Sequence, residues 1–288
     1  MPMIMVLNLK GGVAKTTNAV AMAEGYAYLK KKVLLIDADH QSTASELLLG
    51  ETQLAQAEKQ KRTLHDLLAA MLAESFNPKQ IPKMITPRAS RIQQIQPRID
   101  CLPCSPRIDE FTTNMAKAKK GYNSNEEFLR QLNRLRKILT LWFNRHYDFT
   151  IIDCPPTLSL QVQLLLGSAD YYIIPAIPDR LSLKGSLSLL TRLKKRGYTR
   201  IQCLGTVWSL ARKQIKNHNE IMVAVKKKQN EFAAIPTPFH TVIPNSAAIT
   251  DAMDSRKEFA AFRDKYNDPA RKIFLSLCKE IAERIIES

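Results

Sequence analysis

The segment 9–17 carries the residue types of a phosphate-binding loop. It reads Leu-Lys-Gly-Gly-Val-Ala-Lys-Thr-Thr and lies between an apolar run at 3–9, typical of a buried parallel strand, and a helical pattern that begins near Thr16. Glycines let a backbone fold around phosphate oxygens with several N–H groups directed inward. Lys15 is placed to reach the β- and γ-phosphates, Thr16 to set its hydroxyl on Mg²⁺, and Thr17 to lie near the α-phosphate. The residues expected to surround the phosphates are Gly11, Gly12, Val13, Ala14, Lys15, Thr16 and Thr17.

Three aspartates follow apolar runs that have the length of buried strands. Asp37 and Asp39 come after the run at 33–36, and Asp153 comes after the run at 149–152. Asp153 is suited to hold Mg²⁺ through water, because this ion keeps much of its hydration shell, and we expect Asp37 near the metal. Only one of Asp37 and Asp39 is expected to face the γ-phosphate directly, while the simpler interpretation of the pair is helix capping or solvation after the strand. The expected metal site comprises Thr16, Asp37 and Asp153.

The loop departs from the ordinary P-loop pattern at two positions. Leu9 stands where the first glycine would fall, and Ala14 stands where a glycine would precede the catalytic lysine. What remains, Lys-Gly-Gly-x-x-Lys-Thr at 10–16, resembles the deviant Walker A motif of the ParA/MinD family of ATPases, whose signature residue is the early lysine, here Lys10. A Cβ in the positive-φ conformation that a glycine often adopts at this place costs on the order of 1 kcal/mol. We therefore expect either a strained Ala14 or a backbone that keeps φ negative there.

Further segments strengthen the resemblance. Asp-Ala-Asp-His-Gln at 37–41 is similar to the family's Asp-x-Asp-Pro-Gln, with His40 in place of the proline. Asp-Cys-Pro-Pro at 153–156 matches the family's Walker B box. The segment that contains Pro244 and Asn245 resembles the family's adenine-side segment, so these two residues are expected beside the base.

The resemblance implies an ATPase that works as a dimer. In the family the early lysine crosses to the nucleotide of the partner subunit, so Lys10 is expected to stabilise the transition state in trans, as an arginine finger does. The resemblance assigns orientation of the attacking water to Asp39, and the expected catalytic set is Lys10, Lys15 and Asp39. It also implies a cytoplasmic, nucleoid-associated homodimer that assembles with ATP and Mg²⁺ and binds DNA non-specifically. Such a protein positions a cargo, most often a plasmid or chromosomal centromere complex, through an adaptor or centromere-binding protein that stimulates hydrolysis.

The charge of the chain favours polyanionic partners. Its 288 residues include 43 Lys and Arg against 27 Asp and Glu, a net charge of +16. Basic groups in the C-terminal half could form a positive strip across a two-fold dimer, although each group alone is typical of a solvated helix face. The candidate DNA contacts are Arg192, Lys194, Lys195, Arg212, Lys213, Lys216, Lys226, Lys227, Arg256 and Lys257. Because no recognition-helix unit precedes residue 3, we expect this binding to be non-specific.

The composition narrows the protein class. With 45% hydrophobic and 24% charged residues, and no apolar run near the ~20 residues that span a bilayer, the chain is predicted to be soluble. An odd number of cysteines, 5 in all, implies no disulfide framework. Cys101 and Cys104 have metal-ligand spacing but lack a second pair, which favours core cysteines.

Three alternatives share the same loop. One is the positioning of a protein cargo such as carboxysomes or chemoreceptor clusters. A MinD-like, membrane-associated division-site regulator is disfavoured, because the C-terminal amphipathic helix carries Glu280, Glu283 and Glu287 rather than a basic face, so no membrane partner is expected. An iron–sulfur reductase would need cluster cysteines, such as Cys104 or Cys154, at the dimer axis.

The alternation of apolar runs and helical patterns predicts a single α/β domain over 1–288. The expected fold is a doubly wound, mostly parallel sheet flanked by helices, with a helical elaboration at about 50–122. Strands are predicted at 3–9, 33–36, 99–102, 149–152, 171–174, 201–207 and 240–243. Helices are predicted at 16–29, 64–72, 125–143, 183–195, 216–228 and 269–286.

Overall fold

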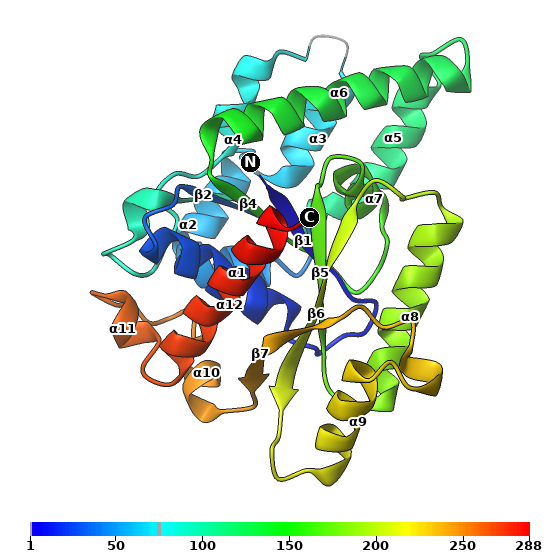
Figure 1. The fold of residues 1–288 in the computed structure, drawn as a ribbon. Coiled ribbons are helices and arrows are strands. Elements are labelled where there is room, and N and C mark those ends of the chain that lie inside the picture. Colours follow the sequence, from blue (N-terminus) through cyan, green and yellow to red (C-terminus); the bar gives the residue numbers. More distant parts are fainter. Residues whose placement is uncertain (1, 74–75) are drawn as a thin grey trace.

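The computed structural model describes residues 2–73 and 76–288, and a seven-stranded sheet forms the centre of the molecule (Figure 1). The strand order is β3-β2-β4-β1-β5-β6-β7, and each pair of neighbouring strands is parallel. The strands are β1 (Met3–Val6), β2 (Val33–Asp37), β3 (Ile99–Leu102), β4 (Phe149–Asp153), β5 (Tyr171–Ala176), β6 (Gln202–Ala211) and β7 (Pro238–Pro244). Since the chain winds outward from β1 in both directions, the predicted doubly wound parallel fold is confirmed.

Helices cover both faces of the sheet. They are α1 (Lys15–Tyr28), α2 (Thr43–Lys59), α3 (Leu64–Leu72), α4 (Ile81–Met84), α5 (Phe111–Lys119), α6 (Asn125–His146), α7 (Leu160–Leu166), α8 (Arg180–Lys195), α9 (Lys216–Lys226), α10 (Ala247–Asp251), α11 (Phe262–Lys265) and α12 (Ala270–Ile286). Short 3₁₀ turns lie at Pro78–Gln80, Gln96–Arg98, Pro106–Glu110 and Asn230–Phe232. Among the residues described, no helix combines the length and the apolar character needed to cross a membrane.

The alternation of side chains along β1 divides the core into two layers. Ile4 and Val6 pack with α1, α2 and α12 on one face, whereas Met3 and Met5 pack with α3, α6 and α7 on the other. Both sets are fully buried, as expected for a central parallel strand. This placement puts the loop after β1 at the middle of the carboxyl edge of the sheet, where open α/β sheets bind ligands.

The segment at 50–122 is partly helical, as predicted. It contains the predicted α3 and the predicted strand β3, together with α5, which the sequence pattern missed. Its first helix, α2, begins earlier, at Thr43, and kinks at Gly50, whose φ is +73°. A side chain at Gly50 would also meet the Arg91 guanidinium 2.8 Å away, so both the backbone angle and the space favour glycine there.

A buried ion pair fastens the C-terminal part of the chain to α1. The Lys265 ammonium donates to Glu24 Oε1 at 2.8 Å, and the Tyr266 hydroxyl donates to Glu24 Oε2 at 2.5 Å. The side chains of Glu24 and Lys265 are 0% and 2% exposed. Because α1 begins at the phosphate loop, this contact ties the α11 segment to the helix that carries the loop.

We expect Lys265→Met to lower the free energy of unfolding by about 3 kcal/mol, because it leaves the Glu24 carboxylate buried without its cation. Urea unfolding measures the change. Lys272→Met is the matched control, since the Lys272 side chain is 74% exposed in its pair with Asp268. If Lys265→Met lowered the free energy of unfolding no more than Lys272→Met does, the result would contradict the buried ion pair.

Candidate nucleotide site

The loop between β1 and α1 leaves the first N–H groups of α1 without a side-chain cap. The helices α3, α6 and α8 begin with capping side chains, from Thr63, Ser124 and Asp179, but α1 begins at Ala14, which supplies none. No acidic residue lies in the first turn of α1. Free N–H groups at the positive end of a helix dipole favour an anion, so the local structure suits a phosphate.

Two residues of this loop have left-handed backbone angles. Gly12 has a φ of +70°, and Ala14 has φ +63° and ψ +34°. The first of the two expectations for Ala14 is therefore confirmed: the backbone keeps the glycine-like conformation and bears the strain of a Cβ. A Cβ added at Gly11 or Gly12 would meet no atom within 4 Å, which leaves open space beside the loop for a ligand.

Lys15 lies folded over the loop. Its ammonium donates to the carbonyl oxygen of Lys10 at 3.0 Å, and the residue is only 7% exposed. Burial lowers the pKa of Lys15, against the opposing influence of the nearby carboxylates of Asp153 and Asp39. The structure therefore brings the predicted phosphate lysine and two of the predicted aspartates into one site.

Lys10 is directed differently from Lys15. Its backbone N–H donates to Asn8 Oδ1 at 3.0 Å, and its Cβ packs so closely on α8 that a Cβ at Gly185 would lie 2.9 Å from it. None of the ion pairs among residues 2–73 and 76–288 involves the Lys10 ammonium. The side chain thus starts along α8, on the side of the loop away from α1.

Asn8 fixes that direction, and sequence reasoning missed it. The side chain is 1% exposed, and its amide donates to the Pro175 carbonyl oxygen at 2.8 Å and to Ser186 Oγ at 3.2 Å. A polar residue inside the apolar run at 3–9 was the available signal, because a buried amide needs partners that the fold must supply.

Thr16 and Asp153 form the part of the site that fits Mg²⁺. The Thr16 hydroxyl donates to Asp153 Oδ2 at 2.8 Å, while Asp153 Oδ1 is buried and has no hydrogen-bond partner. Burial raises the pKa of Asp153, and the negative charges of Asp37 and Asp39 raise it further. No group of three or more His, Cys, Asp or Glu side chains among the described residues could hold a metal, so a site here has few protein ligands. A hydroxyl and an unsatisfied carboxylate oxygen suit Mg²⁺, which keeps several waters.

Asp37 lies beside Asp153 but is already engaged by the chain. The two residues pair in register at the ends of β2 and β4. Asp37 Oδ2 accepts hydrogen bonds from the Ser45 backbone N–H at 2.9 Å and the Ser45 hydroxyl at 2.7 Å, and Oδ1 accepts from Asp39 N–H at 3.1 Å. Burial nevertheless raises its pKa to about 6. Asp37 therefore caps the start of α2, which agrees with the simpler interpretation, and its contact with a metal stays a prediction.

Asp39 is the more accessible of the two carboxylates after β2. Its side chain is 18% exposed, and its Oδ1 lies 3.5 Å from His40 Nδ1 and accepts a hydrogen bond from Gln41 N–H at 3.1 Å. His40, which replaces the family's proline, is exposed and leaves the carboxylate at the surface of the site. This position suits a residue that holds a water.

Arg212 is bound to the predicted adenine-side segment. With the Asn245 amide turned so that its oxygen faces the guanidinium, that oxygen accepts from Arg212 Nε at 2.9 Å and Nη2 at 2.8 Å. The Asn245 N–H donates to the Ala211 carbonyl oxygen at 2.9 Å, and Pro244 ends β7. Arg212 was predicted as a DNA contact, and in the structure it orders the chain beside the candidate base site.

The predicted DNA-contact groups lie at different ends of the sheet in one protomer. Arg192, Lys194 and Lys195 are in the last turn of α8, which returns from the carboxyl edge toward the start of β6, whereas Lys213 follows β6 at the carboxyl edge (Figure 1). The other predicted DNA-contact residues differ in whether they form ion pairs with carboxylates. Lys216 lies 3.7 Å from Glu220, Arg256 and Lys257 both contact Asp254, and Lys227 is exposed.

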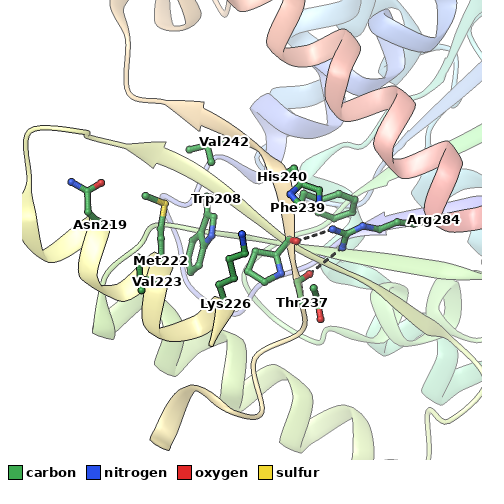
Figure 2. Close-up of a pocket in the computed structure, with 11 residues that line it drawn as sticks. Trp208, Asn219, Met222, Val223, Lys226, Thr237, Phe239, His240, Val242 and Arg284 are labelled. Atoms are coloured by element: carbon green, nitrogen blue, oxygen red, sulfur yellow. Dashed lines mark hydrogen bonds between the residues drawn. The ribbon is translucent and has the colours of Figure 1, made fainter. Parts of the chain in front are cut away.

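Lys226 borders an apolar pocket of about 340 Å³ beside the edge strand β7 (Figure 2). Trp208, Met222 and Phe239 supply much of its wall. Arg284 closes one side, where its guanidinium lies 3.8 Å from the centre of the Phe239 ring and donates to the Pro238 carbonyl oxygen at 2.7 Å. None of the phosphate-loop residues lines this pocket, so it is not part of the candidate nucleotide site.

The cysteines lie in the protein core. Cys101, Cys104, Cys154 and Cys278 are buried and Cys203 is partly buried, and all five are free. Burial raises the pKa of Cys104 and Cys154 well above the ordinary thiol value. The interpretation of Cys101 and Cys104 as core cysteines is confirmed.

Comparisons with known proteins agree with this geometry. A family model described as an AAA domain matches residues 1–202. The sporulation initiation inhibitor protein Soj of Bacillus subtilis is 24% identical over 282 residues, which cover 97% of each chain. The chromosome partitioning protein ParA of Caulobacter vibrioides is 24% identical over 285 residues, 97% of this chain and 93% of that protein. This chain belongs to the ParA/MinD family of ATPases.

Solved ParA-like structures share the whole fold. An ATP complex of McdA from Cyanothece superposes with a TM-score of 0.70 at 20% identity and covers 98% of this chain and 96% of that one. A plasmid partition protein from Borrelia burgdorferi gives a TM-score of 0.61 at 16% identity, with 99% and 98% covered. At these identities the likeness shows the fold alone.

We expect Ala14→Gly to raise the free energy of unfolding by about 0.5 to 1 kcal/mol, because glycine adopts the observed positive φ without a Cβ clash. Urea unfolding of the nucleotide-free protein measures it. The control is Ala55→Gly at an exposed position within α2, where the same change should destabilise by a similar amount. Equal losses at both positions would contradict the strain at Ala14.

Proposed function

We propose that this protein hydrolyses ATP with Mg²⁺ as a homodimer, binds DNA non-specifically while ATP is bound, and positions a chromosome or plasmid through an adaptor protein that stimulates hydrolysis. The names of its relatives, which include chromosome and plasmid partition proteins, support this cargo. The observation that carries the catalytic part is the grouping of Lys15, Thr16, Asp39 and Asp153 around an uncapped helix start.

Each residue of this group has a defined task in phosphoryl transfer. The N–H groups at 11–16 and the Lys15 ammonium bind the phosphate oxygens, after Lys15 exchanges its present bond to the Lys10 carbonyl for the nucleotide. Thr16 and Asp153 would hold Mg²⁺, which would supply positive charge to neutralise the phosphates. Asp39 orients the attacking water by accepting a hydrogen bond from it. Asp37 keeps the Asp39 segment in place through the Asp39 N–H and Ser45.

Lys10 completes the site of the partner subunit in this proposal. Its side chain leaves the loop along α8 and has no carboxylate partner in the described residues, so its charge is available to a second chain. A cation that arrives only when two protomers meet makes both hydrolysis and dimer formation depend on ATP, since the triphosphate is the anion that the two chains share.

For DNA, the exposed groups without ion pairs are the strongest candidates in the proposal. These are Arg192, Lys194, Lys195, Arg212, Lys213, Lys226 and Lys227. The exposed pair of Lys216 with Glu220 is weak and does not prevent a phosphate contact, whereas Arg256 is held by both oxygens of Asp254. Because one protomer places these groups at two ends of its sheet, a continuous strip requires the dimer.

We expect Lys10→Ala to reduce the ATP turnover rate by about a hundredfold or more, because the transition state loses one cation. ATP binding should persist, since Lys15 and the loop N–H groups remain, while ATP-dependent dimers should disappear in light scattering. Lys31→Ala, which removes an exposed lysine after α1, is the control and should leave all three properties unchanged. Unchanged turnover in Lys10→Ala would contradict the trans role.

We expect Asp39→Ala to remain dimeric with ATP and to stay on DNA, because the nucleotide binds but its water is not oriented. The measurement is binding to a DNA duplex of arbitrary sequence across a salt series, with ATP and with ADP. Affinity with ATP should fall steeply as salt rises, as expected for phosphate contacts. Equal binding with ATP and ADP in the unmutated protein would refute the nucleotide gating.

A further inference from the structure

A groove of about 400 Å³ lies between α5, α6 and α7. These helices pack on the face of the sheet opposite α1, and Figure 1 shows their arrangement. Its wall includes Met115, Phe128, Leu132 and Leu164. At its rim Leu129 is 46% exposed, although it belongs to the amphipathic helix α6, most of whose apolar side chains pack inward. The groove therefore offers an apolar surface that the described chain leaves uncovered.

Arg136 adds an uncompensated charge to this groove. Its Nε is buried without a hydrogen-bond partner, and its Nη1 donates only to Asn133 Oδ1, at 3.0 Å. Across 2–73 and 76–288, no carboxylate lies within ion-pair distance of it. Burial lowers the pKa of this guanidinium, which nevertheless stays charged. A half-buried cation without an anion is unfavourable, so a carboxylate from outside would stabilise it.

The surroundings hold the guanidinium in place inside the groove. It lies against the backbone at the end of α7, where a Cβ on Gly167 would be 2.9 Å from Arg136 Cζ. Arg284, in contrast, donates hydrogen bonds to the carbonyl oxygens of Leu204, Thr237 and Pro238 and to the Glu280 carboxylate. Both terminal nitrogens of Arg284 thus donate hydrogen bonds to the chain, whereas Arg136 keeps a buried Nε without a partner.

We propose that this groove binds a short amphipathic helix of a partner protein, whose apolar side chains cover Met115, Phe128 and Leu132 and whose carboxylate pairs with Arg136. Apolar residues three or four positions apart on a helix match a groove between helices, and a carboxylate matches the planar fork of a guanidinium. The net charge of +16 attracts an acidic segment from a distance, and Lys119 on the groove wall adds a further cation.

The groove is connected to the candidate nucleotide site through α7. Asp153 ends β4, and only the segment 154–159 separates it from α7. The side-chain amide of Gln161 on α7 lies 3.5 Å from the carbonyl oxygen of Ala38, between Asp37 and Asp39. A helix that packs on α7 is therefore one element away from the residues assigned to Mg²⁺ and water. This regulatory step rests on the proposed function, whereas the binding step does not.

The test is selection of displayed random 16-residue peptides on the full chain without nucleotide, followed by affinity measurements with synthetic copies of the enriched peptides. We expect these peptides to carry a carboxylate and apolar residues at helical spacing, and to lose tenfold or more in affinity for Arg136→Gln and for Leu129→Asp. Arg134→Gln, an exposed arginine on the same helix, is the matched control and should bind as the unmutated chain does. Arg136→Lys keeps the charge but not the planar fork of the guanidinium, so its affinity for the peptides should lie between those of the unmutated chain and Arg136→Gln.

Enriched peptides that bind Arg136→Gln and Leu129→Asp as tightly as the unmutated chain would overturn the proposal. Self-association of the nucleotide-free protein that Leu129→Asp abolishes would overturn it in favour of a second copy as the occupant. Displacement of the peptide by duplex DNA, with DNA binding itself lost in Arg136→Gln, would overturn it in favour of nucleic acid. Arg136-dependent peptide binding that leaves ATP turnover unchanged would support the groove and refute only its link through α7. Failure of the proposed ATPase function would leave peptide binding intact.

Discussion

Two buried carboxyl groups, at the ends of β2 and β4, set the conditions for everything else at the nucleotide site. Asp37 and Asp153 are neighbours in register on β2 and β4, and burial raises the pKa of both. The nearby ammonium of Lys15 opposes this rise at Asp153, and burial lowers the pKa of Lys15 itself. Asp153 Oδ1 has no partner among the described residues. A site of this kind is stable with a triphosphate only when additional cations enter, and Mg²⁺ is the first of these.

In our proposal the second cation comes from outside the protomer. Lys10 belongs to the same loop as Lys15. Its backbone N–H is bound by Asn8 and its Cβ lies against α8, so its side chain starts toward α8 rather than toward α1. In our proposal this arrangement gives the loop two functions: Lys15 binds the nucleotide of its own chain, and Lys10 is available to the nucleotide of a neighbouring subunit. The strained backbone at Ala14, which lies between them, belongs to the same geometry, because it starts α1 without a cap and leaves N–H groups for the anion.

Much of the fold could be predicted from the sequence, because buried parallel strands are continuous apolar runs. The run at 99–102 became β3 with the same ends, and 64–72 became α3, although both lie in the segment with the weakest pattern. The helices α2, α5 and α7 were missed, since their apolar residues are short stretches interrupted by polar ones. The candidate phosphate-loop residues could be identified because phosphate binding requires particular residue types at fixed spacing.

The partners of those residues could not be predicted, because they come from distant parts of the chain. Asp37 is bound by Ser45 at the start of α2, and Asn8 by Pro175 and Ser186. Arg212 is an example: the sequence predicted a nucleic-acid contact, which stays a prediction, but not the hydrogen bonds that this guanidinium makes to Asn245. Spacing identifies what a residue can do, and only the tertiary structure decides which group it meets.

The most direct test of the shared site mixes two inactive variants. Lys10→Ala lacks the amine that one subunit donates to its partner, and Asp39→Ala lacks the residue that orients the water of its own subunit. In a mixed dimer one site then has an intact Asp39 and receives an intact Lys10, so an equimolar mixture should recover ATP turnover, up to about a quarter of the unmutated value, which is the value for random pairing. If Lys10 instead acts on its own chain's nucleotide, every site in the mixture lacks one of the two groups. A mixture as inactive as its components would contradict donation of Lys10 across the dimer.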